Sequence, residues 1–302
     1  MIPLHLLPEL ANYQDEPKQL ATGSPGKVAQ LRLGFRHRHG KTILHDLYRR
    51  APLIVHRGIY FDEQMPQMPC VFIISNAGGI LQGDRNTIDV TLEENTQAHL
   101  TTQSATKVQE MDANYASQIQ NITLHAGSYL EYVPDPIIPH RHTRFVMQTS
   151  INIDPTATLF ASEIIMGGRK HHGELFEFDL ISSTFAARRP GGQELFTEKL
   201  IIDPQQQSLR QAGIMGNFDV FGSAILLTDK RNFEPIFEQA PCGFHPEEGW
   251  AAGTSRLPHD AGLILKVLSL ESYVARQKIR EFWTLVRRQM FGVDIMKQYS
   301  WH

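Results

Sequence analysis

Between residues 28 and 241, Gly, Pro, Asn and Asp divide the chain into short apolar or alternating segments. Successive side chains of a strand point to opposite faces, so such alternation indicates a strand with one buried face. Phe176, Phe178 and Leu180, with Glu177 and Asp179 between them, show the pattern. Many closely spaced strands predict a mainly β architecture. We expect strands at residues 43–47, 53–56, 71–75, 87–92, 98–102, 118–124, 128–133, 145–153, 159–165, 175–181, 198–202 and 222–227.

The carboxyl end departs from this pattern. Apolar residues there recur every three or four positions, at Ala275, Ile279, Phe282, Val286 and Met290. This spacing predicts one amphipathic helix, and Gly292 is a candidate cap at its end. The helix either packs on the β body or binds a partner. We find no period firm enough for a propeller or a regular solenoid, and no alternation of strands and helices.

The amino-terminal segment differs from the rest of the chain. Residues 12–27 combine Pro, Gly, Ser and charge without periodicity, and such a segment buries too little surface to offset its ordering entropy. We therefore expect a flexible leader, residues 1–27, and a single domain, residues 28–302. The amino terminus lacks the basic region of a signal peptide, and no apolar run approaches the roughly 20 residues that span a bilayer. Two cysteines, Cys70 and Cys242, are too few for a disulfide scaffold, which favours a reducing, cytoplasmic location.

Charge and motifs argue against several functional classes. The formal net charge is −3, from 29 Lys and Arg against 32 Asp and Glu, so the chain as a whole has no basic field for nucleic acid. The run from His39 to Thr42 resembles the end of a phosphate-binding loop, but Phe35 stands where that loop needs glycine. No GxSxG nucleophile elbow occurs, and Cys242 near His245 has no orienting partner. The residues by themselves indicate no enzyme class.

Histidines are the clearest candidate metal ligands, because several of the 14 stand in pairs. Residues i and i+2 of a strand share a face, so His140 and His142 could bind one metal ion. An alternative is a metal-dependent enzyme on an all-β scaffold, which would use His171, His172 and Glu174 with a remote ligand. No HExxH motif is present, and spacing assigns no third and fourth ligand.

Four segments, taken in order, resemble the UreD family of urease accessory proteins, called UreH in some organisms. They are GGILQGD at 78–84, LTTQSATKV at 100–108, GSYLEYVPDPIIPH at 127–140 and SEIIMGGRKHHGELFEF at 162–178. The segments SRLPHDAGLILKVL and REFWTLVRRQMFG near the carboxyl end are similar to the family's ending. The resemblance covers nearly the whole chain from about residue 28.

The resemblance implies a function as well as a fold. It implies a mainly β, β-helix-like body with a few helices, and a cytoplasmic maturation factor that is not an enzyme. Such a protein binds UreF, joins UreG and docks on apo-urease, with no partner among nucleic acids or membranes. It holds no tightly bound cofactor, and nickel passes through it in transit to the urease active site.

The family motifs also imply candidate contacts for this nickel. A passage for a divalent cation needs groups that replace part of the hydration shell yet release the ion. The matching carboxylates are those of Asp84, Glu131, Glu163 and Glu174, and the further candidates are His140, His142 and His172. Arg169 could neutralise Glu163 or Glu174. The alternative stays open for each carboxylate: it is buried and paired with Arg169 or with backbone amides.

Overall fold

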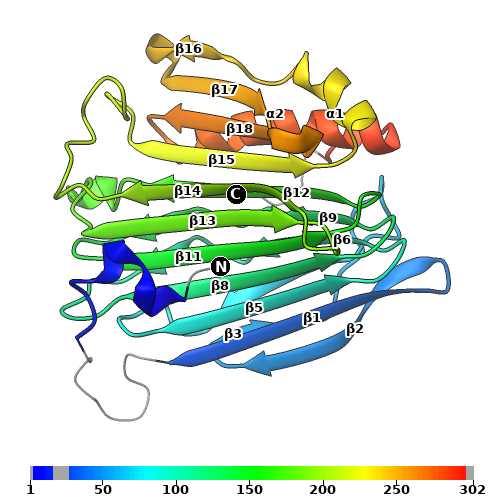
Figure 1. The fold of residues 1–302 in the computed structure, drawn as a ribbon, viewed down its shortest axis with the longest axis horizontal. Helices are drawn as coiled ribbons and strands as arrows, with labels where there is room; N and C mark the ends of the chain where they lie inside the picture. The colour runs from blue at the N-terminus through cyan, green and yellow to red at the C-terminus, as the bar shows by residue number, and fades with distance from the viewer. Residues whose placement is uncertain (1–2, 16–26, 297–302) are drawn as a thin grey trace.

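A computed structural model describes residues 3–15 and 27–296, and it shows two β-sheets stacked face to face (Figure 1). The seven-stranded sheet consists of β1 (Val28–Arg38), β2 (Lys41–Arg50), β5 (Arg85–Leu92), β8 (Ala116–Leu124), β11 (Arg144–Ile153), β13 (Leu180–Arg188) and β14 (Glu194–Ile202). Its strand order is β14-β13-β11-β8-β5-β1-β2.

The eleven-stranded sheet lies behind the first in Figure 1 and extends above it. It consists of β3 (Leu53–Val55), β4 (Cys70–Ser75), β6 (Gln97–Thr102), β7 (Thr106–Val108), β9 (Tyr129–Tyr132), β10 (Ile137–Pro139), β12 (Thr158–Met166), β15 (Val220–Leu227), β16 (Gly243–His245), β17 (Trp250–Arg256) and β18 (Gly262–Ser269). Its main path has the order β16-β17-β18-β15-β12-β9-β6-β4-β3, and β7 and β10 pair beside it.

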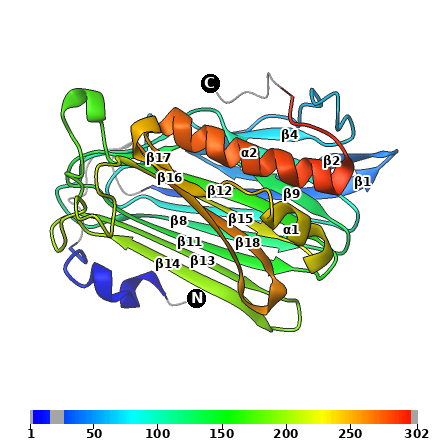
Figure 2. The same ribbon diagram turned by 90° about the horizontal axis from the view of Figure 1, so that it is seen from above.

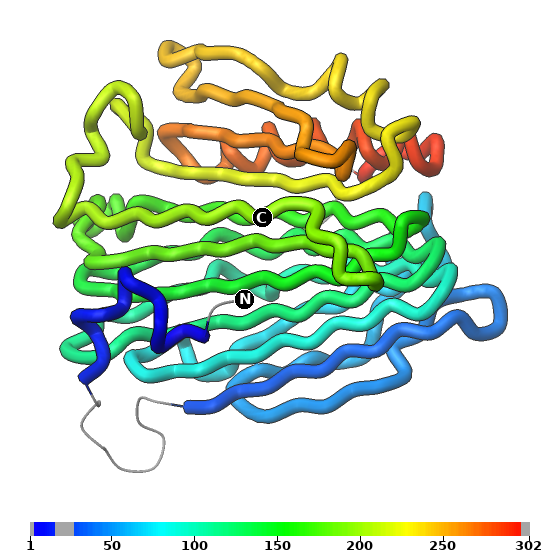
Figure 3. The backbone as a smooth tube through the Cα atoms, viewed as in Figure 1, coloured from blue at the N-terminus to red at the C-terminus, as the bar shows by residue number. Residues whose placement is uncertain are grey.

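The central strands form successive coils, because the chain passes back and forth between the two sheets (Figure 3). Strands β5, β8, β11 and β13 pair in parallel in one sheet, and β4, β6, β9 and β12 do so in the other. The predicted mainly β, β-helix-like body is therefore confirmed. The coils differ in length, since the aligned residues Arg85, Ser117, Val146 and Ser182 are 32, 29 and 36 positions apart. Unequal coils explain why the sequence shows no fixed period.

Antiparallel strands complete both sheets, and a long helix covers the larger one. Strands β15, β18, β17 and β16 form a meander beside β12. Helix α2 (Ser272–Phe291) lies on the face of this sheet that points away from the seven-stranded sheet (Figure 2). Its buried side chains include four of the five that defined the predicted stripe, Ala275, Ile279, Phe282 and Val286. The predicted helix is confirmed, and Gly292 caps it with a left-handed φ of 69°.

Other helical elements are short. Helix α1 (Lys230–Phe237) packs beside α2, and the carboxylate of Asp229 caps it by accepting from the Arg231 amide at 3.0 Å. Sequence reasoning missed α1, as well as β1, β7, β10 and the strands after residue 241. The 3-10 turns are η1 (Leu4–Leu6), η2 (Pro8–Leu10), η3 (Lys170–His172), η4 (Pro246–Glu248) and η5 (Pro258–Asp260). No helix in the described part of the chain has the length and apolarity that crossing a bilayer requires.

One predicted strand, residues 175–181, is wrong. Phe176 has a left-handed φ of 58°, and its N–H bonds to the carbonyl of Gly167 at 2.6 Å. The segment therefore folds back on the chain after β12, and β13 begins only at Leu180. Phe178 is buried in this loop. A folded loop with buried aromatic side chains can therefore show the same apolar alternation in its sequence as a strand.

Part of the expected leader lies against the outer face of the seven-stranded sheet. Leu7 and Leu10 are buried with Tyr115, Val146 and Leu180. Glu9, from the same segment, accepts from the Ser182 hydroxyl at 2.8 Å and pairs with the Lys199 ammonium at 2.7 Å. The rest of the leader, residues 1–2 and 16–26, falls outside the described residues, and the boundary at residue 27 stays a prediction.

The backbone conformation of the glycine-rich loop before β5 can be tested by substitution. Gly79 has φ +145°, and a Cβ there would lie 2.9 Å from the Lys107 carbonyl oxygen and 2.9 Å from the Gln109 side chain. We expect Gly79→Ala to lower the free energy of unfolding by about 1 kcal/mol or more, measured by denaturant titration. Gly253→Ala is the matched control, because its Cβ would meet nothing within 4 Å. Equal stability of the two variants would contradict this account of the loop.

Candidate functional site

The space between the sheets is divided into two apolar clusters with polar side chains between them. Strand β11 shows the pattern, since Phe145 and Met147 belong to one cluster, Ile151 and Ile153 belong to the other, and Thr149 lies between. The neighbouring strands likewise carry apolar residues at each end and polar residues between them. We call the polar set the polar belt, and it consists of Gln118, Gln120, Thr149, Glu163, Ser183, Glu198, Ser223 and Lys266.

Strand register places members of the belt side by side. In the eleven-stranded sheet, Glu163 on β12 is opposite Ser223 on β15, which is opposite Lys266 on β18. In the seven-stranded sheet, Gln120 on β8 is opposite Thr149 on β11, and the Thr149 hydroxyl donates to the Gln120 amide oxygen at 3.2 Å. The belt is thus a transverse row in the eleven-stranded sheet. In the seven-stranded sheet it is staggered, because Ser183 is opposite Met147 and Phe185 stands between Thr149 and Glu198.

Two contacts connect these rows across the interior. The Ser183 hydroxyl, from the seven-stranded sheet, donates to a carboxylate oxygen of Glu163 at 3.2 Å. The Lys266 ammonium lies 2.5 Å from a carboxylate oxygen of Glu198, and it also donates to the Ser223 hydroxyl at 3.0 Å. The Lys266 and Glu198 side chains are 34% and 30% exposed, so the belt reaches solvent at this pair.

The belt surrounds a cavity of about 250 Å³ between the sheets. Residues 75, 78–80 and 102–107, in loops and at strand ends, also line it. One buried polar atom of the lining, the side-chain oxygen of Asn86, has no hydrogen-bond partner among the described residues. A cavity with polar groups in its wall and an unsatisfied acceptor can receive water or a hydrated cation.

Among the carboxylates that line this cavity, Glu163 has a clearly shifted pKa. Burial raises its pKa to about 7, although the Ser183 hydroxyl and the Lys266 charge act in the opposite direction. A carboxyl group with this pKa exchanges its proton near neutral pH. Glu163 can therefore offer either an acid or an anionic oxygen ligand to the cavity.

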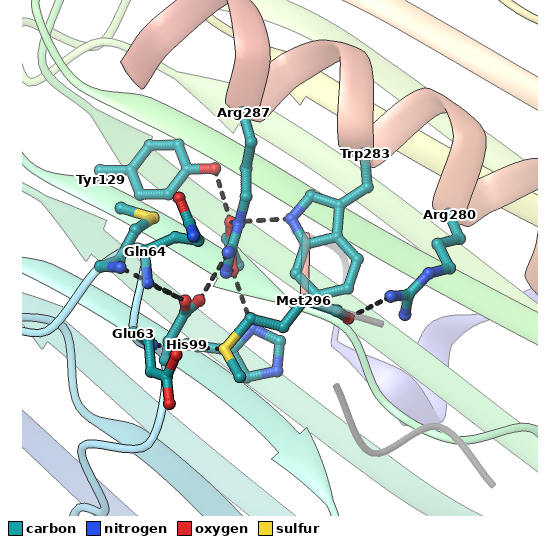
Figure 4. Close-up of polar contacts among 11 residues, drawn as sticks. Glu63, Gln64, His99, Tyr129, Arg280, Trp283, Arg287 and Met296 are labelled. Atoms are coloured by element: carbon teal, nitrogen blue, oxygen red, sulfur yellow. Dashed lines mark hydrogen bonds and ion pairs between the residues drawn. The ribbon is translucent and has the colours of Figure 1, made fainter. Parts of the chain in front are cut away.

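Glu131, a second candidate, lies on the other face of the same sheet, where it accepts from Arg287 of α2. Figure 4 shows Arg287 and Trp283 extending from α2 toward Tyr129 and His99. One of its carboxylate oxygens accepts from the Tyr129 hydroxyl at 2.7 Å, the Trp283 indole at 2.7 Å and Arg287 Nε at 2.6 Å. The other accepts from Arg287 at 2.8 Å and contacts His99 Nδ1 at 2.9 Å. Five polar contacts thus surround the Glu131 carboxylate.

Arg287 completes this buried network. Its remaining terminal nitrogen lies 2.5 Å from a carboxylate oxygen of Asp62, and the side chains of Arg287, Glu131 and Asp62 are at most 1% exposed. Burial disfavours ionisation of Glu131, but the charge and hydrogen bonds of Arg287 outweigh burial and hold its pKa well below the usual range. The contacts occupy the oxygens of Glu131, so its role in this fold is to anchor α2 to the sheet.

Asp84 and Glu174 also have structural partners. The Asp84 carboxylate accepts from the backbone amides of Leu81 and Lys27, each at 2.9 Å, and closes the glycine-rich loop. Glu174 accepts from Arg169 Nε at 2.8 Å and pairs with the rest of that guanidinium. This hydrogen bond lowers the pKa of Glu174. Of the two predicted partners of Arg169, Glu174 is therefore the one it neutralises. Glu163 instead accepts a hydrogen bond from Ser183.

The histidine candidates do not converge. The expected strand geometry for His140 and His142 is wrong, because these residues lie in a turn and His142 has a left-handed φ of 55°. His140 is buried, which lowers its pKa, and His142 Nδ1 lies 3.2 Å from Asp179. His171 and His172 are exposed on η3. Within residues 3–15 and 27–296, no three His, Cys, Asp or Glu side chains form a group that could hold a metal ion.

Comparison with known proteins decides the family. A sequence profile described as UreD urease accessory protein matches residues 27–302. The chain belongs to the UreD family. It is 56% identical over 295 residues to "Urease accessory protein UreD 2" of Brucella suis biovar 1 (strain 1330), which covers 97% of this chain and 98% of the relative. It is 48% identical over 302 residues to "Urease accessory protein UreD" of Yersinia enterocolitica, with 97% and 92% covered.

Membership in the UreD family supports a role in urease maturation. The motifs that carried the resemblance contributed Glu163 to the cavity of this UreD chain, while Asp84, Glu131 and Glu174 lie elsewhere. Sequence reasoning missed the other polar residues of the belt. A signal was present, because Ser223 in FGSAILL and Lys266 in GLILKVLS are polar residues within strongly apolar strands.

The anchoring network under α2 gives one prediction. Arg287→Leu leaves the Glu131 and Asp62 carboxylates buried without their cation, so we expect a loss of about 3 to 5 kcal/mol in the free energy of unfolding. The control is Arg288→Leu, in the next position of α2, where Arg288 forms an exposed pair with Asp294. That change should alter stability little. Similar denaturant midpoints for the two variants would refute the anchoring role.

A second prediction concerns pH. The Glu163 carboxyl has an ordinary pKa of 4.5, near which it titrates in the unfolded chain, and a pKa of about 7 in the fold. Between these values the folded state binds more protons, so rising pH lowers the free energy of unfolding, on the order of 1 kcal/mol per pH unit. Glu163→Gln removes this titration, so the variant should gain stability relative to the parent from pH 4.5 to 7.

Denaturant titrations across this pH range, with the exposed-carboxylate change Glu177→Gln as control, measure the difference. A difference between Glu163→Gln and the parent that does not vary with pH would show that Glu163 titrates normally.

Proposed function

We propose that this UreD chain is a urease maturation factor that works with UreF, UreG and apo-urease and passes nickel to the urease active site. It acts as a scaffold and carrier and has no catalytic turnover of its own. The polar belt is the observation that carries this proposal. Polar side chains in an apolar interior cost stability where they are not fully hydrogen-bonded, so their presence indicates a functional role.

The chemistry of the belt fits a divalent cation in transit. Carboxylate, amide and hydroxyl oxygens are spread along the cavity wall, from Gln120 and Thr149 through Glu163 to Glu198. Each can replace a water of the hydration shell, and a sparse set of such ligands releases the ion again. We therefore place the nickel contacts at Glu163 and Glu198, with no tightly bound cofactor.

At the solvent-exposed end of the belt, Lys266 competes with a bound metal ion for the Glu198 carboxylate. It neutralises Glu198 where the belt reaches solvent, so a cation that binds Glu198 must displace the ammonium group. Competition between two cations for one carboxylate keeps the affinity for nickel low. Weak binding suits a route whose cargo must leave.

The alternative of a metal-dependent enzyme built on His171, His172 and Glu174 gains no support from the geometry. Both imidazoles are exposed on η3, and the Glu174 carboxylate pairs with Arg169.

The test compares two isosteric changes. Glu163→Gln keeps the shape of the belt and removes its central charge, so we expect a several-fold fall in nickel per urease when the variant is co-expressed with urease, UreF and UreG. Glu174→Gln removes a carboxylate outside the cavity, and we expect nickel content near that of the parent. Nickel is measured on purified urease by elemental analysis.

Melting temperature and co-purification with UreF are the controls for folding and docking. A folded Glu163→Gln variant that binds UreF and loads urease with nickel at the normal rate would refute passage past this carboxylate.

A further inference from the structure

The charge of the chain is distributed unevenly. Residues 28–60 contain seven Lys and Arg, four His and one acidic residue, Asp46, in a chain whose net charge is −3. These residues form β1, β2, β3 and the segment that follows, at the lower edge of both sheets in Figure 1. We call this edge the basic edge, and its basic residues, all exposed, are Arg32, Arg36, His37, Arg38, His39, Lys41, His45, Arg49, Arg50, His56 and Arg57.

Internal ion pairs leave much of this charge available. Arg32 pairs with Asp46 at 2.9 Å, and Arg36 pairs with Glu93 at 2.8 Å. Among the described residues, Arg38, Arg50 and Arg57 have no acidic partner. The basic edge therefore keeps an uncompensated positive charge that a negatively charged partner would neutralise.

Strand β2 also has a free side. It ends the seven-stranded sheet and pairs with β1 from Lys41 to Arg50, with a bulge that leaves His45 without a β1 partner in the register. Within the described chain, Thr42 has the only β2 amide that bonds outside this ladder, to the Gln67 carbonyl at 3.1 Å. The remaining outward backbone groups are available to another strand, as at other open sheet edges.

A groove runs along the same edge, and its walls contain both apolar and basic side chains. It lies between β2, through Ile43, Leu44 and Leu47, and the segment that contains Arg57 and Tyr60. Leu47 is 37% exposed, so apolar surface is accessible inside a basic rim. An extended segment pairing with β2 would place every second side chain in this groove.

We propose that the basic edge binds an extended acidic segment of a partner protein, which adds to β2 as an extra strand. Apolar side chains of the segment enter the groove, and its carboxylates meet Arg38, Arg50 and Arg57. A second copy of β2 would carry the same positive charge and be repelled. A nucleic acid would match the charge but supplies neither a strand backbone nor aliphatic side chains. The proposal does not depend on the route taken by nickel.

The test uses the full chain and a labelled ten-residue peptide of alternating Glu and Val, matched to the length of β2. We expect saturable binding by fluorescence anisotropy that weakens with salt. The triple change Arg38→Glu, Arg50→Glu and Arg57→Glu should weaken it roughly tenfold or more, since three ion pairs become repulsive. Arg188→Glu is the matched control, because Arg188 is exposed at the end of β13 in the same sheet, and it should bind as the parent does.

Two further measurements separate strand addition from simple attraction. Bound peptide should slow hydrogen exchange at the amides of residues 43–50, and Leu47→Asn should weaken binding without changing the melting temperature. Failure of the Glu and Val peptide to bind would overturn the proposal. Equal binding of polyglutamate, or tighter binding of single-stranded RNA, would also overturn it. The proposed function is tested by nickel loading in Glu163→Gln, and the strand-addition proposal is tested by peptide binding. Failure of one can therefore be distinguished from failure of the other.

Discussion

In-register parallel pairing of the coils is the constraint on which the rest of this structure depends. Because each coil adds one strand to each sheet, equivalent positions of successive coils fall into rows across the strands. A residue type repeated at one depth of neighbouring strands forms a row in the interior, and the row is interrupted where a strand carries another type, as Phe185 does between Thr149 and Glu198. Apolar residues at the two ends of the strands give two clusters, and polar residues between them give the belt.

Charge is placed differently on the two faces of the eleven-stranded sheet. On the outer face, the Glu131 carboxylate is fully paired with Arg287 and its neighbours, and the network fixes α2 at one position. On the inner face, Glu163 has one hydroxyl donor and a raised pKa. A buried charge with a complete set of partners contributes to a specific structure, whereas an incompletely paired one remains available for a ligand. The same residue type therefore has opposite roles on two neighbouring strands, β9 and β12.

Some of the candidate site was accessible from the sequence. Family motifs identified Glu163 as an acidic candidate, and its place within an apolar strand is consistent with an inward position. The motifs also selected Asp84, Glu131 and Glu174, because in the sequence a carboxylate that caps a loop or pairs with arginine cannot be distinguished from one that contacts an ion. Partners distinguish these cases, and Arg287 lies 156 positions from Glu131 along the chain. No local pattern connects residues so far apart.

The sequence by itself determined the mainly β class, the position of most strands, the amphipathic helix that became α2 and the family. These features depend on period, turn residues and motif order, which are properties of neighbouring residues. Only the tertiary structure decided which carboxylates face the cavity, which are paired, and that the positive charge of residues 28–60 gathers along one free strand. The segment 175–181 shows the physical reason. Its apolar side chains are buried, but contacts with residues distant in the sequence decide whether a buried segment forms a strand or a folded loop.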